Sequence, residues 1–110
     1  MPGITRAPET QRTAQEQKTP HFHVVLLDDD DHTYDYVIEM LQRLFIMSKN
    51  QAFDHAREVD EMGRTIVMTC ELPAAEFARD QIHAYGADPR LARSKGSMSA
   101  VIEPAGAVES

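Results

Sequence analysis

The sequence predicts one small α+β domain: a three-stranded antiparallel sheet with three helices packed on one face, in the order β-α-α-β-α-β. Two patterns and the chain length predict it. Short β-branched or apolar runs alternate with segments whose apolar residues recur at helical spacing. Capping residues stand where those segments begin and end. The chain has 110 residues, which fits one hydrophobic core, and it contains no internal repeat.

The first strand and the first helix follow each other closely. The folded part begins near Pro20, and residues 21–27, HFHVVLL, end in an apolar run that is typical of a buried strand. Thr33 is the better N-cap for the helix, with His32 as the alternative. The helix is predicted from apolar residues at helical spacing: Tyr36, Val37, Met40, Leu41, Leu44 and Phe45.

A capping box predicts where the second helix begins. Ser48 and Gln51 stand three residues apart, and the helix that follows stops before Gly63. One face of this helix carries small and branched apolar residues: Ala52, Ala56 and Val59. The next run, TIVMTC at residues 65–70, is sufficiently β-branched to form the second strand. Its Cys70 is expected to be a small core residue rather than a nucleophile.

Proline and glycine mark the third helix. Pro73 suits its first turn, and Gly86 can cap its end. Its predicted apolar face is Phe77, Ala78, Gln81 and Tyr85. Residues 86–96 read as a loop, and residues 97–103, SMSAVIE, as the closing strand. That strand is expected to place one set of side chains on a common face: Met98, Ala100 and Ile102.

Composition bounds the remaining properties. Residues 1–19 are polar and predicted to be a disordered arm, residues 20–104 the core domain, and residues 105–110 a flexible tail. A formal net charge of −7 argues against nucleic acid as the main partner. One cysteine permits no internal disulfide, and no apolar run has the length of a signal peptide or a membrane span. We therefore expect a cytoplasmic protein that is a monomer when free, with no membrane partner and no cofactor.

Four consecutive aspartates, residues 28–31, follow the first strand and allow three interpretations. They are a solvated turn beside a helix N-terminus, a hard-metal site, or acceptors for an ammonium group. The metal interpretation is the weakest of these, because no calcium-loop spacing is present and the histidines lack zinc-type spacing. An apolar surface beside the carboxylates would suit a ligand with a cation at one end and a side chain at the other. A free peptide N-terminus has this chemistry.

The segment PHFHVVLLDDDDHTYDYVIEMLQRLF, residues 20–45, resembles the ClpS family of protease adaptors. In that family, V-x-L-x-N-D-D-x-T-x-M-x-F-V leads into V-x-x-L-x-x-x-F. The resemblance continues through A-x-x-x-A-x-x-V-x-x-x-G, matched by Ala52, Ala56, Val59 and Gly63, and extends to the last strand. It implies the same element order. The C-terminal domain of a ribosomal stalk protein resembles the ClpS family in fold.

The resemblance implies an adaptor that binds a free N-terminal Leu, Phe, Tyr or Trp and delivers its protein to a ClpA- or ClpC-type AAA+ ATPase with the ClpP peptidase. By position, the α-amino group would be held by Asp28, Asp29, Asp30 and Asp60. The side-chain pocket would be lined by His32, Tyr34, Val37, Ala56, Val59 and Met98.

Several positions depart from the family pattern. Asp28 stands at the family's asparagine, Tyr34 at its gate methionine, and Asp60 at its pocket histidine. Ala56, where the family often has methionine, would widen the pocket and compensate for a rigid ring at position 34.

The face that docks on the ATPase is expected on the third helix, with Glu76 and Arg79 nearest to the family's docking residues. The main alternative is a diverged interaction domain of the same fold that no longer reads N-termini. A carboxylate- or metal-assisted hydrolase is the remaining hypothesis. No nucleophile–base pair or G-x-S-x-G elbow supports it, so we expect a binding protein rather than an enzyme.

Overall fold

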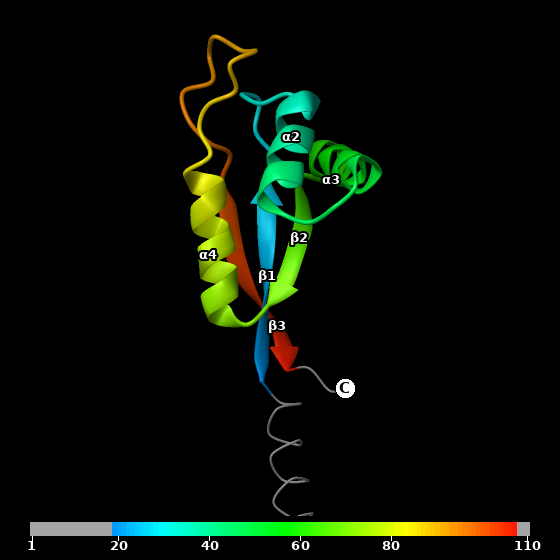
Figure 1. The fold of residues 1–110 in the computed structure, drawn as a ribbon, viewed down its shortest axis with the longest axis vertical. Helices are drawn as coiled ribbons and strands as arrows, with labels where there is room; N and C mark the ends of the chain where they lie inside the picture. The colour runs from blue at the N-terminus through cyan, green and yellow to red at the C-terminus, as the bar shows by residue number, and fades with distance from the viewer. Residues whose placement is uncertain (1–18, 108–110) are drawn as a thin grey trace, which may run out of the picture.

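The computed structural model describes residues 19–107 and confirms the predicted element order (Figure 1). The disordered arm predicted for residues 1–19 lies, except for Thr19, outside the described residues. Within the described part, no helix has the length and apolar character needed to cross a bilayer. The elements are β1 (Pro20–Leu27), α2 (Tyr34–Leu44), α3 (Lys49–Met62), β2 (Arg64–Cys70), α4 (Leu72–His83) and β3 (Ala100–Ala107).

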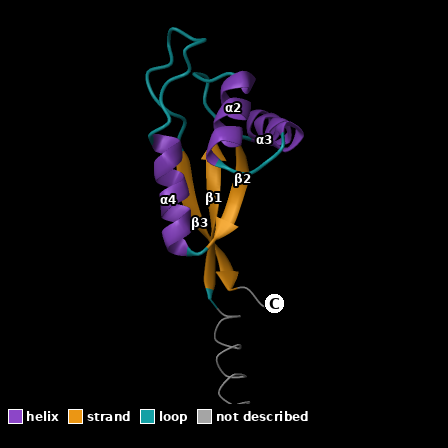
Figure 2. Cartoon of the chain, viewed as in Figure 1, coloured by secondary structure: helices purple, strands orange, loops and turns teal. Residues whose placement is uncertain are grey.

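The sheet is antiparallel with β1 at its centre, in the order β2-β1-β3 (Figure 2). Val24 pairs with Met68 on one side and Ile102 on the other. Val24 and Leu26 stand two residues apart on β1, so both side chains point toward the helices, and both are fully buried. All three helices contribute to the same core, which confirms the predicted α+β class. Its fully or nearly fully buried members include Met40, Leu41, Ala52, Ala75, Ile82 and Ala100.

Local capping signals place both helices that border the site. The side chain of Thr33 accepts a hydrogen bond from the backbone N–H of Tyr36 at the start of α2. Ser48 and Gln51 form the predicted reciprocal capping box at the start of α3. Gly63 ends α3 with φ of 86°, a left-handed conformation that glycine adopts without the Cβ penalty. The predicted starts of both helices and the predicted end of α3 are therefore confirmed, whereas Phe45, predicted as part of the first helix, is the C-cap just after α2.

The predicted end of α4 was wrong, and its predicted face was wrong at Phe77 but right at the buried Ala78. Phe77 is 64% exposed, whereas Ala75, Ala78 and Ile82 are buried. At 100° per residue, Phe77 lies on the opposite side of the helix from Ala75, so the small residues pack on the sheet. The helix ends at His83 with Ala84 as its C-cap, which leaves the predicted face residue Tyr85 and the predicted cap Gly86 beyond the helix.

The closing strand begins and ends later than predicted. It spans Ala100–Ala107 rather than residues 97–103, because β3 pairs with β1 as far as the pair Pro20 and Ala107. Pro104 and Gly106 are poor strand residues, but β3 is an edge strand, where both are tolerated. Residues 105–107 therefore belong to the sheet rather than to the predicted tail, whose residues 108–110 lie outside the described range.

Candidate functional site

A single small hollow lies where the acidic turn, α2, α3 and the segment before β3 meet. Its volume is about 50 Å³. Of the ten residues predicted for the amino group and the pocket, only Asp30 is absent from its lining. The hollow is lined by Asp28, Asp29, His32, Thr33, Tyr34, Val37, Ala56, Val59, Asp60 and Met98.

The floor of the hollow is apolar and belongs to the core. Val37 from α2, Ala56 and Val59 from α3, and Met98 before β3 are each 4% exposed or less. Ala56 and Val59 lie three residues apart, so they share one face of α3. A methyl group at position 56 occupies less room than a long side chain would, which leaves space above the floor.

The rim of the hollow is acidic. Asp28 and Asp60 are exposed, and neither forms an ion pair with a basic residue in the described part of the chain. The hydroxyl of Tyr34 donates to Asp60 Oδ2 at 2.9 Å. Asp28 is held by its backbone, whose N–H donates to the carbonyl of Gly63 at 3.0 Å. Two carboxylates thus border an apolar floor, and neither has a fixed positive partner within residues 19–107.

The Asp28 carboxyl has a raised pKa. Although the residue is exposed, partial loss of water around its carboxyl raises the pKa most; the backbone N–H of Asp29 lowers it, and the nearby charges of Asp60, Asp29 and Asp30 raise it again. This carboxylate therefore carries its charge at an energetic penalty in the free protein. A positive group brought to the rim would relieve that penalty and lower the pKa.

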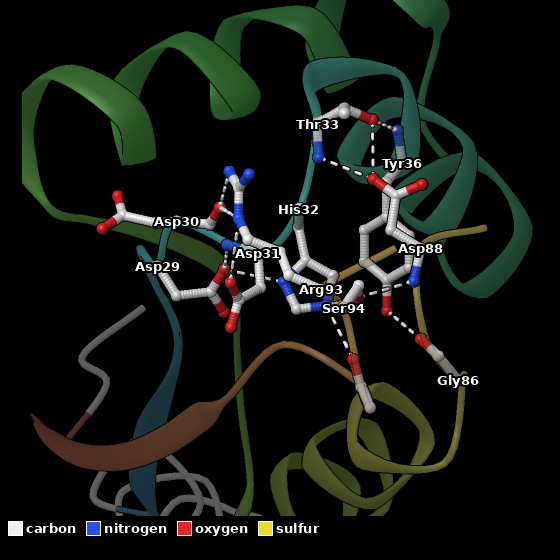
Figure 3. A network of polar contacts seen from close by, with 11 residues as sticks. Asp29, Asp30, Asp31, His32, Thr33, Tyr36, Gly86, Asp88, Arg93 and Ser94 are labelled. Carbon is white, nitrogen blue, oxygen red and sulfur yellow. Dashed lines mark hydrogen bonds and ion pairs between the residues drawn. The ribbon is translucent and has the colours of Figure 1, made fainter. Parts of the chain in front are cut away.

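The Asp29 side chain holds the acidic turn together through hydrogen bonds. Its Oδ1 accepts from the backbone N–H of Asp31 at 2.8 Å and faces His32 Nδ1 at 2.7 Å (Figure 3). The His32 side chain is only 3% exposed, and its Nε2 donates to the carbonyl of Gly96 at 2.7 Å. Both ring nitrogens therefore face acceptors, and His32 links the turn to the loop before β3.

Asp30 does not share the hollow with the other predicted residues. In Figure 3 its carboxylate projects away from the cluster, and the residue is exposed. Its backbone carbonyl accepts from the guanidinium of Arg93, which also pairs with Asp31 at 3.2 Å. The four aspartates thus have different environments: Asp28 is on the rim, Asp29 and Asp31 have partners, and Asp30 faces solvent.

The loop between α4 and β3 supplies residues that the sequence analysis missed. Asp88 is 1% exposed, and its Oδ2 accepts from the backbone N–H and the hydroxyl of Thr33 at 2.7 and 2.8 Å. Burial raises the pKa of Asp88, but hydrogen bonds from Arg90 and Thr33 outweigh it and lower the pKa to about 2. Asp88 therefore fixes the N-cap of α2 beside the hollow. No local signal marks it, since only the closed fold brings residue 88 to residue 33.

The predicted docking residues lie elsewhere. Glu76 and Arg79 are on α4, which contributes nothing to the lining of the hollow. Glu76 is exposed, and Arg79 pairs with Asp80 at 3.1 Å. A docking role for these residues would therefore use a surface separate from the hollow.

The described residues offer neither a metal-holding cluster nor an activated thiol. Among residues 19–107, no group of three His, Cys, Asp or Glu side chains is arranged to hold a metal ion. Cys70 is partly buried against the core, and burial raises the pKa of its thiol, which disfavours the nucleophilic thiolate. The described chain thus combines a small α+β domain with an acid-rimmed apolar hollow.

Comparison with known proteins identifies its family. The model of the family described as ATP-dependent Clp protease adaptor protein ClpS matches residues 17–90. The chain belongs to the ClpS family of Clp protease adaptors. An ATP-dependent Clp protease adapter protein ClpS from a Synechococcus strain is 32% identical over 80 residues, which cover 72% of this chain and 86% of the relative.

Two more distant likenesses extend the comparison. The human E3 ubiquitin-protein ligase UBR1 is 30% identical over 69 residues, or 63% of this chain, but the match spans only 4% of the ligase. The structure of Agrobacterium tumefaciens ClpS2 bound to L-phenylalaninamide covers 78% of this chain and 98% of its own, with a TM-score of 0.67 and 23% identity. This structural likeness supports the ClpS fold.

Proposed function

We propose that this adaptor binds the free N-terminal residue of substrate proteins in the hollow, when that residue is Leu, Phe, Tyr or Trp. It then delivers them in the cytoplasm to a ClpA- or ClpC-type AAA+ ATPase with ClpP. The observation that carries the proposal is the placement of two carboxylates, Asp28 and Asp60, that have no ion-pair partner among residues 19–107 and lie beside a buried apolar floor. A related structure that contains L-phenylalaninamide, which has a free amine and an aromatic side chain, supports the ligand class.

The two parts of the ligand have separate sites. The α-ammonium group, with three donors and a positive charge, is held by Asp28 and Asp60 on the rim. Asp29 orders the turn, and its carboxylate, which also contacts His32, is a further acceptor for the ammonium group. The first side chain enters toward Val37, Ala56, Val59 and Met98.

Neither part alone accounts for binding. Burial of a Leu or Phe side chain contributes about 1.5–3 kcal/mol, which does not offset an association cost of about 4–15 kcal/mol. Each charge-assisted hydrogen bond adds about 1.5–3 kcal/mol. The hollow therefore selects chain starts, because an internal residue offers one amide N–H and no charge.

Delivery uses other surfaces. The adaptor acts as a monomer when free and carries out no bond chemistry itself. The exposed part of α4 around Glu76 and Arg79 docks on the ATPase, away from the hollow. Substrate and ATPase can then be held at the same time.

A peptide panel tests the proposal. Fluorescence anisotropy should be measured with labelled peptides that differ only in the first residue: Leu, Phe, Tyr, Trp, Arg or Met. The four bulky hydrophobic residues are expected to bind, and each matched N-acetylated peptide is expected to bind at least about 100-fold more weakly. Equal affinity for free and acetylated peptides would contradict the proposal.

Peptide affinity is also expected to depend on pH through Asp28. Its pKa is raised in the free protein, and a bound ammonium lowers it, so protons compete with the peptide. The raised pKa lies above the ordinary value of 3.8. Peptide affinity should therefore fall as the pH decreases toward and through that raised pKa. Anisotropy titrations between pH 4 and 8 measure this. In Asp28→Asn the decline should be shallower; an unchanged profile would contradict the role of Asp28.

A further inference from the structure

One hydrogen bond joins the two helices that border the hollow. Tyr34 is the first residue of α2, and Asp60 lies in the last turn of α3. The Tyr34 hydroxyl donates to Asp60 Oδ2 at 2.9 Å, and its ring packs against Phe53 with ring centroids 5.8 Å apart. Both partners are exposed, whereas the floor residues are buried, so the bond lies on the solvent side of the hollow.

With this bond in place the hollow is too small for the proposed ligand. Its volume is about 50 Å³. An apolar cavity of about 150 Å³ is known to accept benzene, and one water molecule takes up about 30 Å³ of liquid. A Leu or Phe side chain therefore enters only if a lining residue moves.

Among the large side chains that line the hollow, Tyr34 has room to move. The floor residues Val37, Ala56, Val59 and Met98 are packed into the core, each 4% exposed or less. Tyr34 is 37% exposed, and its ring can turn toward solvent without opening a void in the core. That rotation separates its hydroxyl from Asp60.

We propose that the bond between Tyr34 and Asp60 is a latch, opened by the α-ammonium group of the ligand; this rests on the proposed function. An ammonium competes for Asp60 Oδ2 with a neutral phenol, and its charge-assisted bond is the stronger. Once released, the Tyr34 ring turns outward and the first side chain reaches the floor. Tyr34 is thus a specificity-determining residue: a bulky group without a positive nitrogen leaves Asp60 bonded and the hollow closed.

A double-mutant cycle tests the latch. Tyr34→Phe keeps the ring but removes the donor, so the free protein opens more readily. Its dissociation constant for a labelled peptide that begins with Phe should fall by about 3- to 10-fold. In an Asp60→Ala background the latch has no acceptor, so the same Tyr34→Phe change should leave the dissociation constant unchanged. Asp28 keeps binding measurable in that background.

A matched control carries the same chemical change outside the hollow. Tyr85→Phe also removes one phenolic oxygen, but Tyr85 does not line the hollow. The Tyr85→Phe variant should therefore bind the same peptide with the dissociation constant of the unchanged protein. Weaker binding by Tyr34→Phe would show that the hydroxyl contacts the ligand itself and would overturn the latch. Equal effects in both Asp60 backgrounds, or no effect in either, would overturn it too.

The unchanged protein separates this proposal from the proposed function. If it binds the free peptide and not the acetylated one, the N-terminal reader stands whatever the cycle shows. If it makes no such distinction, the reader fails and the latch fails with it.

Discussion

Replacement of Asp88 by alanine is expected to lower the free energy of unfolding by about 3–4 kcal/mol. The residue is 1% exposed, and its carboxylate accepts from Thr33 and Arg90. The alanine variant leaves the backbone N–H of Thr33 without this partner beside the hollow. Urea denaturation at pH 7, followed by circular dichroism, measures the loss. Peptide affinity is expected to fall as well, because the N-cap of α2 positions Tyr34.

The control is an exposed aspartate with an ion-pair partner. Asp54 pairs with Arg57 at 3.4 Å, and both side chains are more than half exposed, so Asp54→Ala should change the stability by less than about 1 kcal/mol. Similar losses for the two variants would show that Asp88 has no special structural role.

Acid should remove part of the contribution of Asp88. Its pKa is about 2 in the folded protein against 3.8 as the ordinary value, so the folded state binds fewer protons than the unfolded state. The contribution of about 2 kcal/mol is fully present above pH 3.8 and declines as the pH falls toward 2. The stability gap between the unchanged protein and Asp88→Asn should narrow over that range. A constant gap would contradict the lowered pKa.

Removal of both rim charges is expected to weaken peptide binding by about 100-fold or more. The double variant Asp28→Asn with Asp60→Asn keeps the shape of the rim but cannot offer a negative charge to the ammonium. The fold should be preserved, because both residues are exposed and neither has an ion-pair partner in the described chain. Anisotropy with a labelled peptide that begins with Phe measures the loss.

The acidic turn provides a matched control for that variant. Asp30→Asn with Asp31→Asn removes the same amount of charge close to the rim, but neither residue lines the hollow. Asp31 pairs with Arg93 on the surface, where such a pair contributes little to stability. This control should bind within about 3-fold of the unchanged protein. An equal loss in both double variants would show that overall negative charge, and not the rim, attracts the peptide.

Local signals predicted the elements that border the hollow. Thr33, Ser48 and Gly63 act through hydrogen bonds or backbone angles within a few residues, so their sequence context is sufficient. The prediction of the apolar floor combined helical spacing with the family resemblance, and the predicted residues do meet in one hollow.

Features set by tertiary contacts were missed or placed wrongly. Phe77 is the largest apolar residue of α4, yet the helix packs on the core through Ala75, Ala78 and Ile82 and leaves Phe77 exposed. The end of β3 depends on its pairing with β1, which lets Pro104 and Gly106 stand in an edge strand. Asp88 meets Thr33 across 55 positions of sequence, a separation that no motif encodes.

The most direct test of an acid-rimmed hollow that reads chain starts is an NMR titration. Isotopically labelled protein should be mixed with L-phenylalaninamide and, separately, with its N-acetyl form. The free amine should shift the backbone amide signals of Asp29, Tyr34, Val59 and Met98, and the acetylated compound should leave them in place. Shifts confined to other surfaces, or the same shifts with both compounds, would contradict recognition of the N-terminus at this hollow.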